Sequence, residues 1–199
     1  GVYLNGFSED SQLLQQGGCI FSAGSLNIQK SILSDCKAQV AAAIYASGSF
    51  VNIERSFFQN NQAVWASVLK TELNTDTVIQ VSSFIANDNI IVDNHLNQGS
   101  VFWIQGPMQI VHSQFLAHQL GRAPLMILQS SASIYNSIFA YQQNVETNQQ
   151  ENKASLFYFD QDLTLSGNVI FKNKKGSTRS ICGGKKVGCI QRLRFGFSL

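Results

Sequence analysis

The chain of 199 residues is poor in charge, since Asp, Glu, Lys and Arg make up only 13% of it. Globular domains usually contain about 25% of these residues. Neutral Asn, Gln and Ser fill most polar positions instead. No apolar run approaches the ~18 residues that a membrane-spanning helix needs, so we expect no membrane span in this segment. No stretch shows an apolar stripe at the 3.6-residue period, which argues against a helical fold.

Motifs of common chemistry are also missing. No glycine-rich phosphate loop follows a predicted strand, and there is no nucleophile elbow. The three histidines, His95, His112 and His118, form no pair with metal-ligand spacing. We therefore expect neither a cofactor nor a metal site, and we place the histidines at corners or on the surface.

A sequence unit instead recurs six times, as in IERSFFQNN at residues 53–61 and IQVSSFIAN at residues 79–87. Each copy has a polar anchor, with Ile or Leu three residues before it and a large apolar residue two residues after it. The anchors are Ser31, Ser56, Ser82, Ser113, Ser137 and Asn168. Five residues after the anchors come Cys36, Asn61, Asn87, His118, Gln142 and Asn173. Such self-similarity predicts stacked repeats.

The pattern within a unit identifies its structure. Apolar residues alternate with period two around Val51 and Ile53, and glycine- and serine-rich turns separate the runs. We interpret each unit as three short strands and three corners, which can bury its inward face only against a neighbouring unit. The sequence predicts an all-β fold, a right-handed single-stranded parallel β-helix (solenoid) of about six to seven coils. Residues 1–16 form a lead-in or partial coil, 17–173 the repeats, and 174–199 a basic cap or degenerate coil.

The recurring columns have a physical interpretation. Phe58 and its equivalents should point inward and stack on the next rung, about 4.8 Å away. Asn61 and its equivalents should lie at a corner, because Asn tolerates the left-handed backbone found there and stacked amides can hydrogen-bond along the column. Like charges in register would repel, which accounts for the low charged fraction.

Several of these motifs resemble those of a known family. GGCI at residues 17–20, followed by FFQNN, FIAN and IFKN, is similar to the GGAI and FxxN tetrapeptides of polymorphic outer-membrane-protein repeats. More broadly, residues 17–173 resemble pectin-lyase-like β-helices of cell-surface proteins, although only the first copy keeps both glycines. The resemblance implies a surface or adhesive β-helix that is part of a larger chain.

Catalytic carboxylates can be sought with the repeat register. β-Helix lyases and hydrolases place acidic groups on neighbouring rungs, so that two carboxylates, or carboxylates with calcium, meet one sugar. Glu54 has no acidic neighbour in its column, and Asp160 and Asp162 flank a corner where a turn role is expected. The loop acids Asp88 and Asp93 have no visible partner. We predict no catalytic residue.

Two inserts lengthen the repeats. Residues 88–100 and 143–155 each place thirteen residues after the Asn-type corner, where most copies have six or seven. Both should project from the same side of the solenoid, and recognition usually lies on such loops. The first carries an apolar run, so we predict an interaction loop there. Its residues are Ile90, Ile91, Val92, Asp93 and His95.

The four cysteines divide into two pairs. Cys182 and Cys189 enclose the flexible segment GGKKVG and could form a disulfide. Cys19 and Cys36 lie about two-thirds of a coil apart in the predicted repeat, which makes a bridge between them doubtful. Free buried thiols are the alternative for all four.

Charge is uneven along the chain. Residues 172–199 contain eight Lys or Arg and no acid, whereas residues 1–171 contain six basic and twelve acidic residues. The basic end could meet acidic glycans, nucleic acid or an acidic protein face, but a solvated cap is the simpler interpretation and we expect no nucleic-acid partner.

These observations favour a non-catalytic structural or adhesive module, extracellular or at the cell surface. It would bind a protein or glycan and form part of a longer chain or assembly. A carbohydrate-active β-helix enzyme, either a polysaccharide lyase or a glycoside hydrolase, is one alternative. A scaffold subunit of a large assembly is another.

Overall fold

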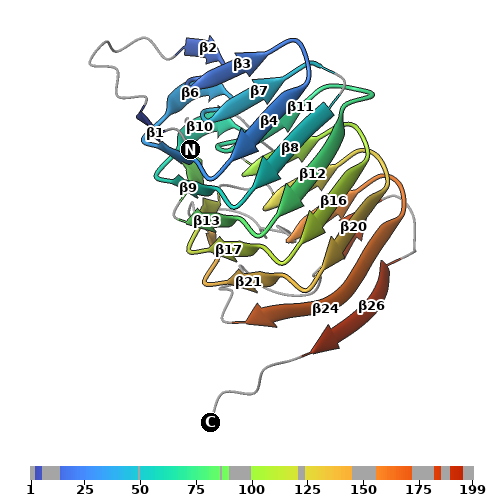
Figure 1. The fold of residues 1–199 in the computed structure, drawn as a ribbon. Helices are drawn as coiled ribbons and strands as arrows, with labels where there is room; N and C mark the ends of the chain where they lie inside the picture. Colours follow the sequence, from blue (N-terminus) through green and yellow to red (C-terminus); the bar gives the residue numbers. More distant parts are fainter. Residues whose placement is uncertain are drawn as a thin grey trace, which may run out of the picture.

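The computed structural model describes residues 3–5, 14–48, 50–85, 87–89, 100–120, 124–144, 156–171, 182–184 and 189–194. These residues contain strands and turns but no helix, and every pair of neighbouring strands among them is parallel (Figure 1). Sheets stack repeat on repeat, an arrangement consistent with a solenoid. Accordingly, no helix in this part of the chain is long and apolar enough to cross a membrane.

The strands lie in four sheets. The first is seven-stranded and comprises β3 (Ile20–Ser22), β7 (Ile44–Ala46), β11 (Leu69–Thr71), β15 (Phe102–Ile104), β19 (Met126–Leu128), β23 (Phe157–Phe159) and β25 (Cys182–Gly184). A four-stranded sheet comprises β2 (Leu14–Gln16), β6 (Lys37–Val40), β10 (Gln62–Trp65) and β14 (Asp88–Asn89). Two further strands, β18 (Gln119–Leu120) and β22 (Gln143–Asn144), pair with each other.

The largest sheet has 13 strands in two rows. The first row is β4 (Leu26–Gln29), β8 (Phe50–Glu54), β12 (Asp76–Gln80), β16 (Met108–Val111) and β20 (Ala132–Tyr135). The second row is β1 (Tyr3–Asn5), β5 (Ile32–Ser34), β9 (Phe57–Gln59), β13 (Ser83–Ile85), β17 (Gln114–Leu116) and β21 (Ile138–Ala140). The long strand β24 (Leu163–Phe171) pairs with both rows, and β26 (Cys189–Arg194) pairs with β24.

The register predicted from the sequence is confirmed. Ile28, Ile53 and Ile79 are direct partners in neighbouring strands, and the column continues through Ile110 and Ile134. The number of strands per repeat was wrong, however, because a fourth short strand follows the Asn-type corner, as in β6 and β10. Its inward positions hold alanines, Ala38 and Ala63, which are fully buried but too small to give a visible apolar period.

Aromatic rings fill the centre of the stack. Phe58, Phe84, Phe115 and Phe139 are fully buried and occupy successive strands of the second row. Their ring centroids are 5.0, 5.0 and 4.7 Å apart with nearly parallel planes. Phe102 and Phe157 meet this column edge-on from the seven-stranded sheet. Stacked and edge-on pairs are the two favoured aromatic geometries.

The anchor serines hold each repeat to the next. The backbone N–H of Ser31 donates to Ser56 Oγ at 3.2 Å, and that of Ser56 donates to Ser82 Oγ at 3.2 Å. The pattern repeats through Ser113 and Ser137 and ends on the side chain of Asn168. Each serine hydroxyl also donates to the carbonyl two residues before it, as Ser56 does to Glu54 at 2.9 Å. We call this series the serine ladder.

A left-handed residue precedes each anchor. Lys30, Arg55 and Val81 have φ near 50°, and so do His112 and Asn136, whereas Gly167 has φ 67°. This backbone conformation costs roughly 1–2 kcal/mol in a residue with a side chain. The N–H of the left-handed residue forms a hydrogen bond, however. The N–H of Lys30 donates to the carbonyl of Glu54 at 3.0 Å, and that of Arg55 donates to the carbonyl of Gln80 at 3.0 Å. The strain is therefore offset by bonds to the neighbouring repeat.

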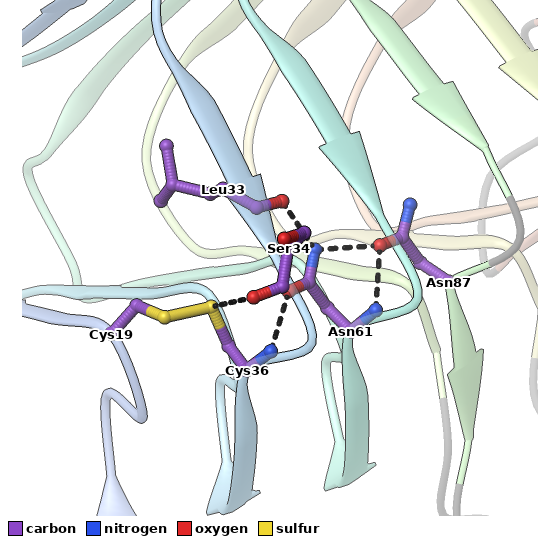
Figure 2. The surroundings of a disulfide bond; sticks show 6 residues. All are labelled: Cys19, Leu33, Ser34, Cys36, Asn61 and Asn87. Atoms are coloured by element: carbon purple, nitrogen blue, oxygen red, sulfur yellow. Dashed lines mark hydrogen bonds between the residues drawn. A yellow bond between two sulfur atoms is a disulfide. The ribbon is translucent and has the colours of Figure 1, made fainter. Parts of the chain in front are cut away.

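The second corner has a similar series, which we call the amide ladder (Figure 2). The N–H of Cys36 donates to Asn61 Oδ1 at 3.0 Å, and that of Asn61 donates to Asn87 Oδ1 at 3.1 Å. The two amides also bond directly, Asn61 Nδ2 to Asn87 Oδ1, at 2.7 Å. The predicted hydrogen bonding along the column is thus confirmed. The backbone reason given for asparagine was wrong, because the left-handed residue is the preceding one, Asn60, with φ 54°.

The structure also corrects the view of Cys19 and Cys36, which form a disulfide with Cα atoms 5.7 Å apart (Figure 2). The corner at residues 17–19 folds back against the start of β6. A Cβ on Gly18 would lie 2.5 Å from the carbonyl oxygen of Lys37, so only glycine permits this approach. The distance counted along the repeat therefore overestimated the separation across its interior.

Replacement of Phe58 by alanine tests the aromatic column. Phe58→Ala should lower the free energy of unfolding by about 3–5 kcal/mol, because it opens a cavity between Leu33 and Phe84. Urea unfolding would measure this loss. Phe50→Ala is the matched control, since Phe50 is 39% exposed on β8, and it should change stability by less than about 1 kcal/mol. Equal effects of the two substitutions would contradict the predicted role of the column.

Candidate functional site

The outward face of the seven-stranded sheet carries a column of large side chains. Phe21, Tyr45, Lys70 and Trp103 are register partners in β3, β7, β11 and β15. Each is the middle residue of a three-residue strand. Alternation therefore turns it outward while its neighbours, such as Leu69, point into the core.

The side chains of this column stack on one another. The rings of Phe21 and Tyr45 are 5.4 Å apart and 6° from parallel. The Nζ atom of Lys70 lies 5.0 Å from the centroid of Tyr45 and 5.4 Å from that of Trp103, so the cation is held between two rings. Trp103 also stacks on Trp65 of β10, at 5.1 Å. Each cation–π contact is worth about 0.5–2 kcal/mol, depending on its exposure.

Glu72 completes the charge balance. The Tyr45 hydroxyl donates to the Glu72 carboxylate, and Lys70 Nζ lies 3.3 Å from Glu72 Oε1. The bond from Tyr45 lowers the pKa of Glu72, while burial, followed by the bond to Glu72, raises the pKa of Tyr45 to about 12. Near neutral pH, Glu72 is therefore ionised and Tyr45 protonated, which leaves the tyrosine unsuited to act as a nucleophile or base.

Amide side chains border the indole rings. Trp103 Nε1 donates to Gln129 Oε1 at 3.2 Å, and Gln105 Nε2 donates to the same oxygen at 2.8 Å. The resulting surface is rigid, aromatic and partly exposed, with polar groups at its border. We call it the aromatic face and define it as Phe21, Tyr45, Trp65, Lys70, Glu72 and Trp103. Lys70 and Glu72, its ionised groups, are paired with each other.

The aromatic face was not predicted from the sequence. The signal was present in the strands IFS, IYA, FWI and FYF, each of which has an aromatic residue in the middle. The repeat alignment followed the inward columns, whose residues recur almost unchanged. Outward residues vary from strand to strand, and Trp65 reaches the face from a strand that was not predicted.

The acidic candidates are not brought together. Glu54 lies in β8, where it accepts a hydrogen bond from Gln29 Nε2 at 3.2 Å and pairs with Arg55. Asp160 and Asp162 lie in the turn before β24, and three strands of the first row separate that strand from β8. Across the described ranges, no group of three or more His, Cys, Asp or Glu could hold a metal ion.

Two histidines can be placed. His112 is exposed, with Asn136 Nδ2 3.4 Å from its Nε2. His118 is fully buried in the amide ladder, where the N–H of Asn87 donates to its Nδ1 at 3.1 Å and its own N–H donates to Gln142 Oε1 at 3.1 Å. Burial lowers the pKa of His118 to about 4. This histidine therefore serves as a neutral ladder residue, as its place in the Asn column predicted.

The remaining predicted site residues cannot be placed. The interaction loop, with Ile90, Ile91, Val92, Asp93 and His95, lies outside the described residues. The backbones of Cys182 and Cys189 lie in β25 and β26. The structure does not describe their side chains, so the predicted disulfide between them stays a prediction.

Comparisons with known proteins add no assignment. No protein-family model, curated protein or solved structure matches this chain.

The buried histidine predicts a dependence of stability on pH. The unfolded chain takes up a proton on His118 near pH 6.5, but the folded chain resists protonation until about pH 4. Stability should therefore be full above pH 6.5 and should fall between pH 6.5 and 4, by on the order of 3 kcal/mol. Thermal unfolding at a series of pH values would measure this fall.

His118→Asn tests whether the histidine causes this fall. The variant introduces the residue found at two other positions of the ladder. It should remove most of the acid-induced loss and keep the stability at pH 7 within about 2 kcal/mol of the original. An unchanged pH profile in this variant would show that other groups cause the loss.

Proposed function

We propose that this chain is a non-catalytic structural and adhesive module, a segment of a larger extracellular or cell-surface protein that binds a protein or glycan partner. Its architecture would be a right-handed single-stranded parallel β-helix of about six to seven coils. The resemblance of its repeats to those of polymorphic outer-membrane proteins supports this architecture and this role.

One observation supports the proposal most strongly: the polar groups that recur in each repeat serve the structure itself. Serine hydroxyls, asparagine amides and a buried histidine bond one repeat to the next. In an enzyme, several such groups would converge on a substrate. Here they provide a rigid support that leaves the outward faces for recognition.

The aromatic face is the surface that we assign to binding. Tryptophan and tyrosine are enriched among residues that dominate binding energy, because they offer large contact area at little cost in conformational entropy. The stacking of Trp65 on Trp103 and the bond from Trp103 to Gln129 fix these rings in advance. A partner would then bind without paying to order them.

An oxidising environment is supported by the cysteines. Cys19 and Cys36 are bonded, and disulfides persist mainly in secreted and surface proteins. A bond that closes a loop of this length typically contributes about 3 kcal/mol, so the first described repeat would be weakened in a reducing compartment.

Binding can be monitored with the protein's own fluorescence. The chain has two tryptophans, and both belong to the aromatic face. Titration with soluble glycans and with candidate surface proteins should give a saturable change in tryptophan emission for at least one ligand. Lys70→Ala should lower the affinity for that ligand about tenfold or more. Lys30→Ala, at a corner of another sheet, should leave the affinity unchanged. Equal effects of the two variants would contradict the assignment.

A cleavage assay separates this proposal from the enzyme alternative. Pectin, alginate and similar acidic glycans should remain uncut by the purified protein, with or without calcium, because no two of the described carboxylates lie on adjacent rungs in one column. Release of reducing or unsaturated ends, lost in Asp160→Ala or Asp162→Ala, would favour a carbohydrate-active enzyme instead.

A further inference from the structure

A column of polar side chains runs beside the aromatic face. It consists of the residues that directly follow four strands of the seven-stranded sheet, β11, β15, β19 and β23. We call it the polar column, and its members are Glu72, Gln105, Gln129 and Asp160. The strands before the last three end at Ile104, Leu128 and Phe159, which are register partners. These polar residues therefore lie on successive rungs and, by alternation, on the same outward side as Trp103.

Two oxygen atoms of the polar column have no donor. Gln129 Oε1 accepts from Trp103 Nε1 at 3.2 Å and from Gln105 Nε2 at 2.8 Å. On the rungs before and after it, Gln105 Oε1 and Asp160 Oδ1 are buried, and no donor among the described residues bonds to them. Both side chains are only half-buried, so a small rotation brings either oxygen to the surface. Since buried acceptors are nearly always paired, two unpaired ones at one place indicate a ligand that supplies donors.

The charges of this surface disfavour an acidic ligand. Lys70 and Glu72 are paired with each other at 3.3 Å, so this lysine is not free to bind an anion. An acidic ligand would also meet the carboxylate of Asp160 and the two unpaired oxygens, all of which repel it. A ligand that is neutral and rich in donors fits this arrangement.

We propose that the ligand of the aromatic face is a neutral glycan chain that lies along the stacking axis. Its sugar rings stack on the exposed parts of Trp65 and Trp103, and its hydroxyl groups donate to Gln105 Oε1 and Asp160 Oδ1. This inference rests on the proposed function and names the class of ligand that the face binds.

The chemistry of a sugar matches both columns. The C–H groups on the face of a sugar ring are slightly positive and the face of an aromatic ring is negative, so the two attract each other. Each sugar hydroxyl can rotate and donate a hydrogen bond. The backbone N–H groups of a folded protein partner are mostly paired within that partner, so they are less free to meet these acceptors. A polymer of repeating units also suits a surface that repeats at each rung, about every 4.8 Å.

Titration of tryptophan emission with defined oligosaccharides tests the proposal. The neutral probes are hexasaccharides of glucose, mannose, xylose and N-acetylglucosamine, and the acidic probe is hexagalacturonate. At least one neutral hexasaccharide should bind with saturation, about tenfold or more tightly than its own disaccharide, because it spans more rungs. It should exceed hexagalacturonate by a similar factor. Failure of every neutral probe to bind, or equal binding of the acidic probe, would overturn the proposal.

Variants of the polar column locate the ligand. Gln105→Ala should lower the affinity for the neutral hexasaccharide about tenfold or more. Gln105→Met, which keeps the length of the side chain but not its acceptor, should do the same if the alanine variant folds poorly. Gln109→Ala is the matched control, an exposed glutamine on β16, and should leave the affinity unchanged. Asp160→Asn removes the charge and keeps an acceptor, so it should narrow the difference between the neutral and acidic probes.

The outcomes separate this inference from the proposed function. A surface protein that binds in a manner sensitive to Lys70→Ala, with no binding of any neutral glycan, would overturn the glycan assignment and leave the proposed function in place. Neutral-glycan binding that is sensitive to Lys70→Ala but equal in the Gln105 variants and the Gln109 control would overturn the role of the polar column. Insensitivity to all of these substitutions would overturn the assignment of the aromatic face as well.

Discussion

One hydrogen bond underlies the whole stack: a backbone N–H at a corner of one repeat donates to a side-chain acceptor in the next. The serine ladder makes it at one corner, with N–H to Oγ distances of 3.1 to 3.3 Å, and the amide ladder makes it at another. A corner N–H cannot join the sheet ladder, and a buried unpaired N–H would cost about 1–3 kcal/mol. Each side-chain acceptor removes that cost and fixes the spacing of the repeats.

This constraint also explains the composition of the chain. A ladder residue must be neutral and must offer an acceptor to the N–H of the preceding repeat, because its neighbours of the same kind lie one rung away. Ser and Asn meet these needs, and His118 can take a place in the ladder because burial lowers its pKa to about 4 and so keeps it neutral near pH 7. Like charges in these columns would repel in register. The low charged fraction is thus a property of the stacking.

The sequence could predict those parts of the structure whose residues recur from repeat to repeat, but not the others. Inward and ladder residues recur in every repeat, so the Phe58 column, the Ser56 column and the place of His118 could be predicted. The strands around Ala38 and Ala63 could not, because small inward residues give no visible period. The Cys19–Cys36 bond could not either, since it depends on how the corner at Gly18 folds back across the interior.

The candidate site was missed for a related reason. The aromatic face lies outside the repeating columns, where each strand is free to differ. Trp65 and Trp103 meet across two sheets, and Lys70 lies between rings from two other strands. No spacing within the sequence indicates that these side chains come into contact. Inward-facing residues recur from one repeat to the next, whereas outward-facing residues differ between strands. A recognition surface is therefore best sought on the outward face.

Hydrogen exchange of the corner amides tests the central claim most directly. The N–H groups of Ser31, Ser56, Ser82 and Ser113 and of Asn61 and Asn87 donate to side chains in the next repeat, so they should exchange as slowly as amides within the neighbouring strands. Measurement by NMR resolves them individually. Exchange of these amides at the rate of exposed turns, with the strand amides still protected, would contradict the account that the ladders hold the repeats together.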